Sequence, residues 1–221
     1  AMTYCVGVVL EAGMVFASDS RTNAGVDNIS TYRKMAVFER PGDRVIVMMS
    51  SGNLSVTQNA INLLDQKSRN AEAGVTLWTA QSMFEVASLL GDCLREVKRR
   101  DGPYLMQNNI DANANFIVGG QIKGEKMRLF MLYQEGNFIE ATPETPFFQI
   151  GETKYGKPII DRVVKPSTSV IDATKCVLIS FDSTMRSNVS VGLPIDVACY
   201  HANQLRLSMK RRIGESDPYY N

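Results

Sequence analysis

The sequence predicts an α+β fold in which two stacked, mainly antiparallel sheets lie between two layers of helices, a four-layer αββα sandwich. Along the 221 residues, strand-like segments alternate with pairs of helix-like segments in the order strands, helices, strands, helices, strands. This order suits sheets whose outer faces are covered by helices. Three strand-like segments are also apolar throughout, as expected of strands buried on both faces: 8–10, 45–49 and 129–132.

The N-terminal half predicts two hairpins followed by two helices. Strands are expected at 5–10 and 14–18, and again at 35–39 and 45–49, because short turn segments rich in Gly or Pro separate the apolar runs. From Leu54 the apolar residues recur at helical spacing as far as the polar stretch 67–73. A longer helix is predicted from 79 to 100, and Gly102-Pro103 should end it.

The C-terminal half repeats this alternation. Strands are predicted at 115–119, 127–133 and 137–141, with a further short one at 147–150. A helix should follow at 156–164, and another should run from Asp172, a candidate N-cap, to about residue 188. The last predicted pair of strands covers 195–200 and 205–210.

Composition excludes several classes of function. The chain carries 24 basic and 23 acidic residues, so no strong field attracts nucleic acid or a membrane surface. No apolar run approaches the length of a membrane span, and no leader precedes the first strand, so we expect one cytoplasmic domain covering 1–221. Four scattered cysteines and a single histidine, His201, argue against a metal site or a His-based triad. No cofactor is expected.

A threonine near the start of the chain is the first candidate nucleophile. Met2 reads as the initiator and Ala1 as the remnant of a tag, so removal of Met2 would give Thr3 a free amine. A hydroxyl needs an adjacent base to act as a nucleophile, and a free amine on the same residue is one solution. Asp19 ends a strand that can return to Thr3, and Lys34 opens the next. The alternative reading is a polar chain end, a turn aspartate and a solvated lysine.

Two other features have simpler explanations. Segment 151–157 has the spacing of a phosphate-binding loop, but Pro158 occupies the position that needs a hydroxyl for magnesium, so it predicts only the start of a helix. Cys5 should face the same side of its strand as Thr3. It is expected either to be a small buried residue or to form the floor of a pocket.

These residues resemble a known family. Thr3, Gly7, segment 13–21, Lys34 and Ser51-Gly52 are similar to the N-terminal half of proteasome-type catalytic subunits. The amino-acid sequence of segment 18–29 most resembles Anbu, the bacterial ancestral beta subunit, which is similar to HslV and to proteasome beta chains. The resemblance extends over nearly the whole chain, and it implies an N-terminal nucleophile hydrolase with the sandwich fold.

The resemblance assigns catalytic roles by position. Thr3 oxygen would attack a peptide or amide carbonyl, and its freed amine, with an ordinary pKa of about 7.7 to 8.0, would accept the proton. Lys34, held by Asp19, would keep that amine partly deprotonated. The Gly52 N–H would bind the oxyanion at the start of a helix. Arg21 would brace Asp19 and the neighbouring loops.

The sequence also departs from the family pattern, in which a Ser-Gly pair and an Asp-x-x-Ser motif support the amine. Gly151-Glu152-Thr153 stands near the first, and 187–190 stands at the second. Ser190 matches, but Ser187 replaces the aspartate and cannot supply its charge. Lys34 is also one residue closer to Thr3 than usual, which a shorter loop could absorb. The alternative function is therefore a non-catalytic assembly or scaffold protein.

Substrate and partners follow from position and resemblance. Thr22, Ser50 and Leu54 are expected to line the pocket beside the nucleophile, and Asn23 to pair with substrate backbone. The family implies a homo-oligomer, a ring or an open helical ring, with ATP-grasp-like and transglutaminase-like functional neighbours. The exposed face of the long helix and the tail 211–221, rich in Arg, Pro and Tyr, are expected contact surfaces.

Overall fold

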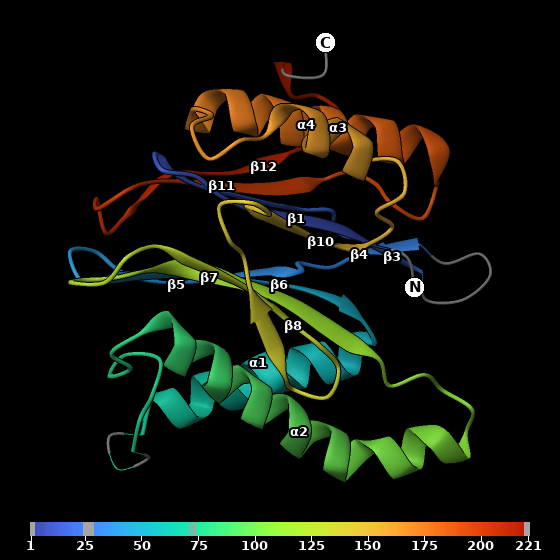
Figure 1. Cartoon of the computed structure of the whole chain (residues 1–221). Helices are drawn as coiled ribbons and strands as arrows, with labels where there is room; N and C mark the ends of the chain where they lie inside the picture. The colour runs from blue at the N-terminus through green and yellow to red at the C-terminus, as the bar shows by residue number, and fades with distance from the viewer. Residues whose placement is uncertain (1–2, 24–28, 71, 73, 219–221) are drawn as a thin grey trace.

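Two five-stranded antiparallel sheets lie face to face between two pairs of helices (Figure 1). The computed structural model describes residues 3–23, 29–70, 72 and 74–218, with only the backbone of residues 23, 29 and 30. The helices occupy the two outer layers and the sheets the two inner ones. The predicted αββα sandwich is therefore confirmed.

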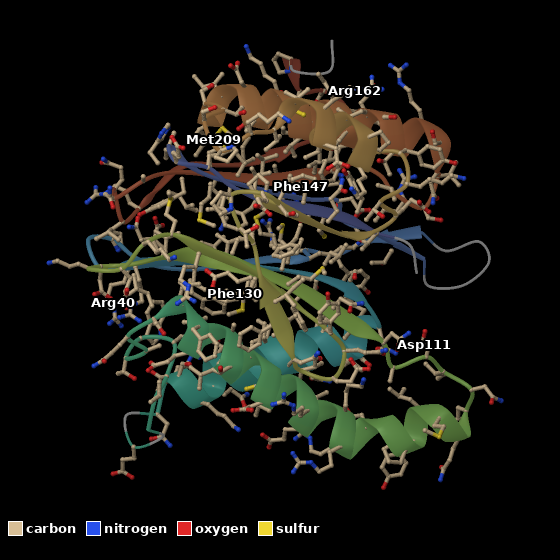
Figure 2. All side chains as sticks on the ribbon, viewed as in Figure 1. Arg40, Asp111, Phe130, Phe147, Arg162 and Met209 are labelled. Carbon is tan, nitrogen blue, oxygen red and sulfur yellow. The ribbon has the colours of Figure 1, made fainter. Side chains whose placement is uncertain are left out.

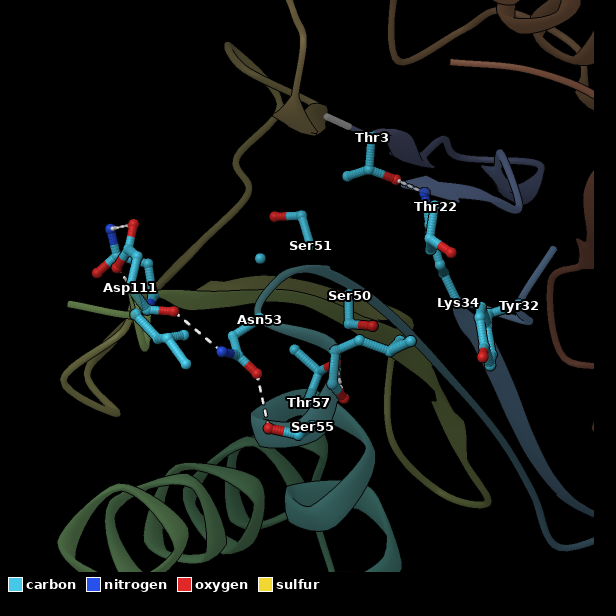
Figure 3. Close-up of a pocket in the computed structure, with 14 residues that line it drawn as sticks. Thr3, Thr22, Tyr32, Lys34, Ser50, Ser51, Asn53, Ser55, Thr57 and Asp111 are labelled. Atoms are coloured by element: carbon cyan, nitrogen blue, oxygen red, sulfur yellow. Dashed lines mark hydrogen bonds between the residues drawn. The ribbon is translucent and has the colours of Figure 1, made fainter. Parts of the chain in front are cut away.

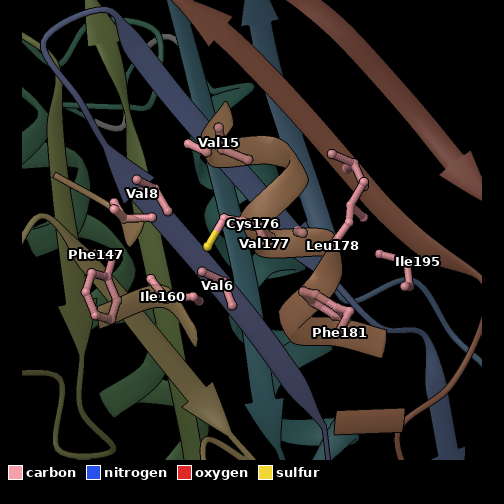
Figure 4. Packing of buried hydrophobic residues seen from close by; sticks show 14 of the residues in the cluster. Val6, Val8, Val15, Phe147, Ile160, Cys176, Val177, Leu178, Phe181 and Ile195 are labelled. Carbon is pink, nitrogen blue, oxygen red and sulfur yellow. The ribbon is translucent and has the colours of Figure 1, made fainter. Parts of the chain in front are cut away.

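The first sheet has the strand order β10-β1-β2-β11-β12. Its strands are β1 (Tyr4–Val9), β2 (Gly13–Ser18), β10 (Phe147–Gly151), β11 (Ile195–His201) and β12 (Leu207–Ile213). Helices α3 (Lys157–Val163) and α4 (Val170–Ser187) cover its outer face. Figure 4 shows how the side chains of Val6 and Val8 on β1 pack beneath Val177 and Phe181 of α4 in one apolar cluster.

The second sheet has the order β5-β6-β7-β8-β9. Its strands are β5 (Met35–Arg40), β6 (Arg44–Gly52), β7 (Ala114–Ile122), β8 (Arg128–Leu132) and β9 (Phe138–Glu140). Helices α1 (Leu54–Ser68) and α2 (Met83–Gln107) cover its outer face and bury the apolar side chains predicted from their helical spacing. A separate two-stranded ribbon, β3 (Arg21–Asn23) with β4 (Ile29–Thr31), was not predicted.

A third apolar cluster fills the space between the sheets. Its members alternate with outward-facing residues along each strand, as the pleat of a β-strand requires; Met14, Phe16, Val47 and Met49 are all fully buried there. Figure 2 shows side chains filling the spaces between all four layers. The site described below lies at one end of this central layer, where β1 begins.

Several predicted boundaries were wrong. Gly102-Pro103 does not end the long helix, because α2 continues to Gln107 with Pro103 inside it. Asp172 is not the N-cap of α4: Ser169 Oγ accepts a hydrogen bond from Asp172 N at 3.1 Å, which places Asp172 in the first turn, where a negative charge suits the helix dipole. The last strand, predicted at 205–210, is β12 at Leu207–Ile213 and therefore includes the first residues of the tail 211–221. Within the described part of the chain, no helix is long and apolar enough to cross a membrane.

Candidate active site

Thr3, Asp19 and Lys34 converge into one buried cluster. Thr3 precedes β1 and is only 3% exposed. Its hydroxyl donates to Asp19 Oδ1 and accepts from Lys34 Nζ. Lys34 Nζ also lies 2.8 Å from Asp19 Oδ1, so the three side chains contact one another in pairs. The expectation that the strand end would bring Asp19 back to Thr3 agrees with these contacts, and Lys34 contacts both residues, as the family resemblance implies.

Asp19 is fully buried and is held by backbone donors as well as by the cluster. Tyr4 N donates to Asp19 Oδ1 at 3.1 Å, and Gly192 N donates to Asp19 Oδ2 at 3.4 Å. Buried carboxylates require such donors, because an unpaired charge in a dry site costs several kcal/mol. The Asp19 carboxylate is thereby fixed in place beneath Thr3.

Lys34 enters the cluster immediately before β5. Its Nζ donates to the carbonyl oxygen of Arg21 at 2.7 Å, which ties the start of the β3–β4 ribbon to the site. The side chain is only 6% exposed. Despite its unusual sequence spacing from Thr3, Lys34 reaches the threonine hydroxyl.

A cavity of about 540 Å³ opens beside Thr3 and Lys34. Figure 3 shows Thr22, Lys34 and Tyr32 on one side of it and Asn53 and Asp111 on the other. Four residues predicted to lie near the nucleophile line it: Thr22, Ser50, Gly52 and Leu54. The side chain of Asn23, predicted to pair with substrate backbone, lies outside the described residues.

Sequence reasoning missed the opposite wall of the cavity, which includes Ile110, Asp111 and Asn113 from the loop between α2 and β7. The N-cap Asn53 joins this loop to α1: its side chain accepts from Val56 N at 3.1 Å and donates to Asp111 O at 3.0 Å. An Asn just before a helical pattern is a recognisable N-cap signal. Nothing in the sequence indicated that the Asn53 side chain also donates to Asp111 O.

Strand register directs the N–H of Gly52, a residue that lines the cavity, toward the β5 edge of β6. Asn53 N donates to Asn113 O at 2.7 Å across to β7, whereas Ser50 N donates to Lys34 O at 3.1 Å on the other edge. Because successive N–H groups of a strand point to opposite edges, Gly52 shares the edge of Ser50, beyond the first residue of β5. A Cβ at position 52 would lie 2.1 Å from Asn113 O, and φ is +107°, so only glycine fits.

The other flank of Thr3 is formed by the chain that follows β10. Glu152 N donates to Thr3 O at 2.6 Å. Asn188, after α4, donates from its side-chain amide to Glu152 Oε2 at 3.4 Å and accepts from Ser190 N at 2.9 Å. Ser190 is thus linked to this flank through its backbone.

Ser187 and Arg21 have different surroundings. Ser187 is exposed and its hydroxyl donates to Ser183 O within α4, at 3.0 Å. Arg21 donates to Val189 O at 2.7 Å, and its guanidinium lies against Gly192, whose N–H contacts Asp19. This arrangement suits the bracing role predicted for Arg21, whereas the described contact of Ser187 lies within its own helix.

Burial keeps two neighbouring side chains, Cys5 and Tyr4, in their neutral forms. Desolvation raises the pKa of the Cys5 thiol, with the charge of Asp19 as the next contribution. Cys5 is completely buried, which agrees with its reading as a small core residue. Desolvation likewise raises the pKa of Tyr4, whose hydroxyl is hydrogen-bonded to Ser180 at 3.0 Å and to Gln149 at 2.6 Å.

Two stacked antiparallel sheets between helix layers, with a threonine at the start of an inner strand, define a sandwich of the proteasome beta-subunit class. Solved structures of Anbu (ancestral beta-subunit) proteins match this chain over nearly its full length. The protein from Yersinia bercovieri is 51% identical, with a TM-score of 0.92 and coverage of 98% of this chain and 89% of that one. The chain belongs to the Anbu family.

Two further structures agree. Anbu from Hyphomicrobium sp. strain MC1 is 49% identical, with a TM-score of 0.90 and coverage of 98% of this chain and 90% of that one. A structure described as the helical assembly of the Anbu complex from Pseudomonas aeruginosa is 47% identical, with a TM-score of 0.93 and coverage of 98% and 89%. No protein-family model matches the chain. No curated protein matches it either.

Proposed function

We propose that the chain is an N-terminal threonine hydrolase that cleaves a peptide or amide bond. The observation that carries the proposal is the convergence of Lys34 Nζ and the Asp19 carboxylate on Thr3 Oγ, at the wall of a cavity. A buried ammonium beside a hydroxyl favours its alkoxide form. The cavity leaves room for a carbonyl next to that oxygen.

The reaction begins once the residues before Thr3 are removed. Thr3 Oγ bonds to the carbonyl carbon while its proton passes to the freed α-amine, directly or through a water molecule. The scissile C–N bond then breaks, and the proton moves to the leaving amine. Water attacks the resulting ester and restores Thr3.

Gly52 is proposed to bind the oxyanion. Gly52 lines the cavity at the end of β6, immediately before the N-terminus of α1, where the helix dipole favours negative charge. A preorganised backbone donor in such a place typically accounts for about 10²- to 10³-fold in rate. The polar residues Thr22 and Ser50 then hold the substrate beside it.

Self-association is proposed as part of the function. The P. aeruginosa relative is described as a helical assembly, and this chain shares its fold along almost the whole length. We propose that this chain also forms a homo-oligomer, ring-like or helical, that encloses or aligns the cavities.

The test is covalent labelling by a peptide epoxyketone or vinyl sulfone. The protein is produced as a fusion whose cleavage leaves Thr3 as the first residue, and adduct formation is followed by intact-protein mass spectrometry. We expect one adduct on the Thr3 chain and none on Thr3→Ala. The chain that still carries Met2 should also remain unlabelled, because its Thr3 nitrogen is an amide and cannot accept a proton.

A second candidate function is a non-catalytic assembly protein that retained the fold. The contact of Ser187 with Ser183 O favours it, because this position then provides no acid to the threonine. If the Thr3 chain folds and assembles but is not labelled at any pH, the hydrolase proposal fails and this second function is preferred.

A further inference from the structure

Two charged side chains, those of Lys34 and Asp19, contact Thr3, and both lie at its hydroxyl. Its hydroxyl contacts the Lys34–Asp19 pair, but the proposed mechanism also needs a group that orients the α-amine. That amine lies on the main chain, on the side where β1 meets the end of β10. The inference below rests on the proposed function and concerns this second flank.

Glu152 lies directly opposite Thr3. The last described pair between β1 and β10 joins Tyr4 to Gly151, so the next step in the register places Glu152 across from Thr3. The 2.6 Å bond from Glu152 N to Thr3 O confirms that contact. Residues in a hydrogen-bonded antiparallel pair exchange both N–H and C=O groups, with Cα atoms about 5.5 Å apart. Because the N–H and C=O groups of one strand residue point to the same edge, we infer that the nitrogen of Thr3 lies on the edge that faces Glu152.

The Glu152 carboxylate is held by two hydrogen-bond donors. Oε2 accepts from the Asn188 side-chain amide and Oε1 from Lys154 N, each at 3.4 Å. Asn188 is fixed in turn by Ser190 N, at 2.9 Å from its Oδ1. The side chain is half-buried. The acid on this flank thus comes from the loop after β10, whereas position 187 at the end of α4 carries a serine.

We propose that Glu152, held by Asn188, is the positioning residue for the freed α-amine of Thr3. Its main-chain carbonyl and its carboxylate face the new ammonium group and direct it toward the threonine hydroxyl. Glu152 acts through the amine and does not touch the substrate carbonyl. This role compensates for the serine at position 187.

The sign of its effect follows from the neighbouring charges. Lys34 and Asp19 lie at the hydroxyl, Arg21 lies against Gly192 behind Asp19, and Cys5 is buried as a neutral thiol. The Lys154 ammonium lies over the Tyr155 ring, 5.6 Å from its centroid. A carboxylate within about 4–6 Å stabilises an ammonium and raises its pKa by 1–3 units. Removing the Glu152 charge must therefore lower the pKa of the amine.

The experiment measures that pKa without requiring catalysis. Chains that begin at Thr3 react with cyanate between about pH 5 and pH 10, and carbamoylation of the N-terminal peptide is followed by mass spectrometry. Because only the neutral amine reacts, the rate profile gives its pKa. Glu152→Gln is compared with Asn188→Ala and with the control Glu144→Gln, whose carboxylate is exposed in another loop.

We expect Glu152→Gln to lower the pKa of the amine by about one unit. Asn188→Ala should shift it in the same direction by less, and Glu144→Gln should leave it unchanged. An unchanged pKa in Glu152→Gln overturns the inference, and if that variant does not fold, an unchanged pKa in Asn188→Ala does so. If Glu152→Gln lowers the pKa as expected but the parent chain that begins at Thr3 is not labelled by the probe, the hydrolase proposal fails and the positioning role of Glu152 stands.

Discussion

Gly151 packs so closely against Thr3 that a Cβ at position 151 would lie 2.1 Å from the Thr3 carbonyl oxygen. Its φ of +86° is also a backbone conformation that residues other than glycine rarely adopt. These two constraints bring the chain after β10 around the start of β1, where Glu152 N can reach Thr3 O. The position of the threonine is therefore set partly by a glycine remote in sequence.

Gly151→Ala should both destabilise the protein and displace Thr3. We expect a loss of about 3 kcal/mol in the free energy of unfolding, from the positive φ and the clash together. Gly124→Ala is the matched control, because its φ is +84° and no atom lies within 4 Å of the added Cβ; it should cost about 1 kcal/mol. Urea unfolding at fixed protein concentration compares the two. Equal losses would show that the Thr3 contact does not restrict position 151.

The Lys34–Asp19 pair gives a second prediction. Lys34→Met leaves the fully buried Asp19 without its cation, and breaking a buried pair in this way typically costs about 3 to 5 kcal/mol. The control Lys67→Met breaks the exposed pair with Glu96 and should cost less than about 1 kcal/mol. The double variant Lys34→Met with Asp19→Asn should lose less than the sum of the single variants. Additive losses in urea unfolding would contradict the coupling.

The proximity of Thr3 and Asp19 could be predicted because each lies at the end of a strand whose apolar pattern is clear, whereas the approach of Lys34 was implied by the family resemblance. A hairpin brings the end of β2 back to the start of β1, with Cys5 paired to Ser18. The register then places Asp19 next to Tyr4, and its carboxylate accepts from Tyr4 N at 3.1 Å. Local pattern and strand geometry were sufficient for this part of the site.

The remaining parts depend on contacts between segments distant in sequence. No local pattern connects Asn53 to Asp111, or Glu152 to Asn188, since each pair is formed only when helices and loops from different layers pack together. Pro103 lies in the last turns of α2, which are exposed, so the backbone carbonyl that proline leaves without a partner is accessible to solvent. The burial of a residue decides whether a proline is tolerated in a helix, and it cannot be deduced from the sequence of a single segment.

The cysteines provide a third prediction. All four are buried, and burial raises the pKa of Cys93 to about 11. At pH 8 its thiolate fraction should then be about 1 in 1,000, and the thiolate is the reactive form. In the folded protein we expect reaction with a disulfide reagent to be at least about 100-fold slower than in urea. A thiol that reacts rapidly before unfolding would contradict this burial, and cysteine-to-serine variants would identify it.

Self-association gives the last prediction. Two large side chains near the end of α2 are unusually exposed, Tyr104 at 70% and Met106 at 77%, and such residues on a helix are typical of contact surfaces. We expect Met106→Glu to lower the average mass measured by sedimentation at micromolar concentration, because a charge would have to be buried in the interface. Ile171→Glu is the control: it places the same charge at a residue 65% exposed on α4, in the opposite helix layer, and should leave the mass unchanged. A parent chain that sediments as a monomer would refute assembly itself, whereas a loss of mass only in Ile171→Glu would move the contact to the α4 layer.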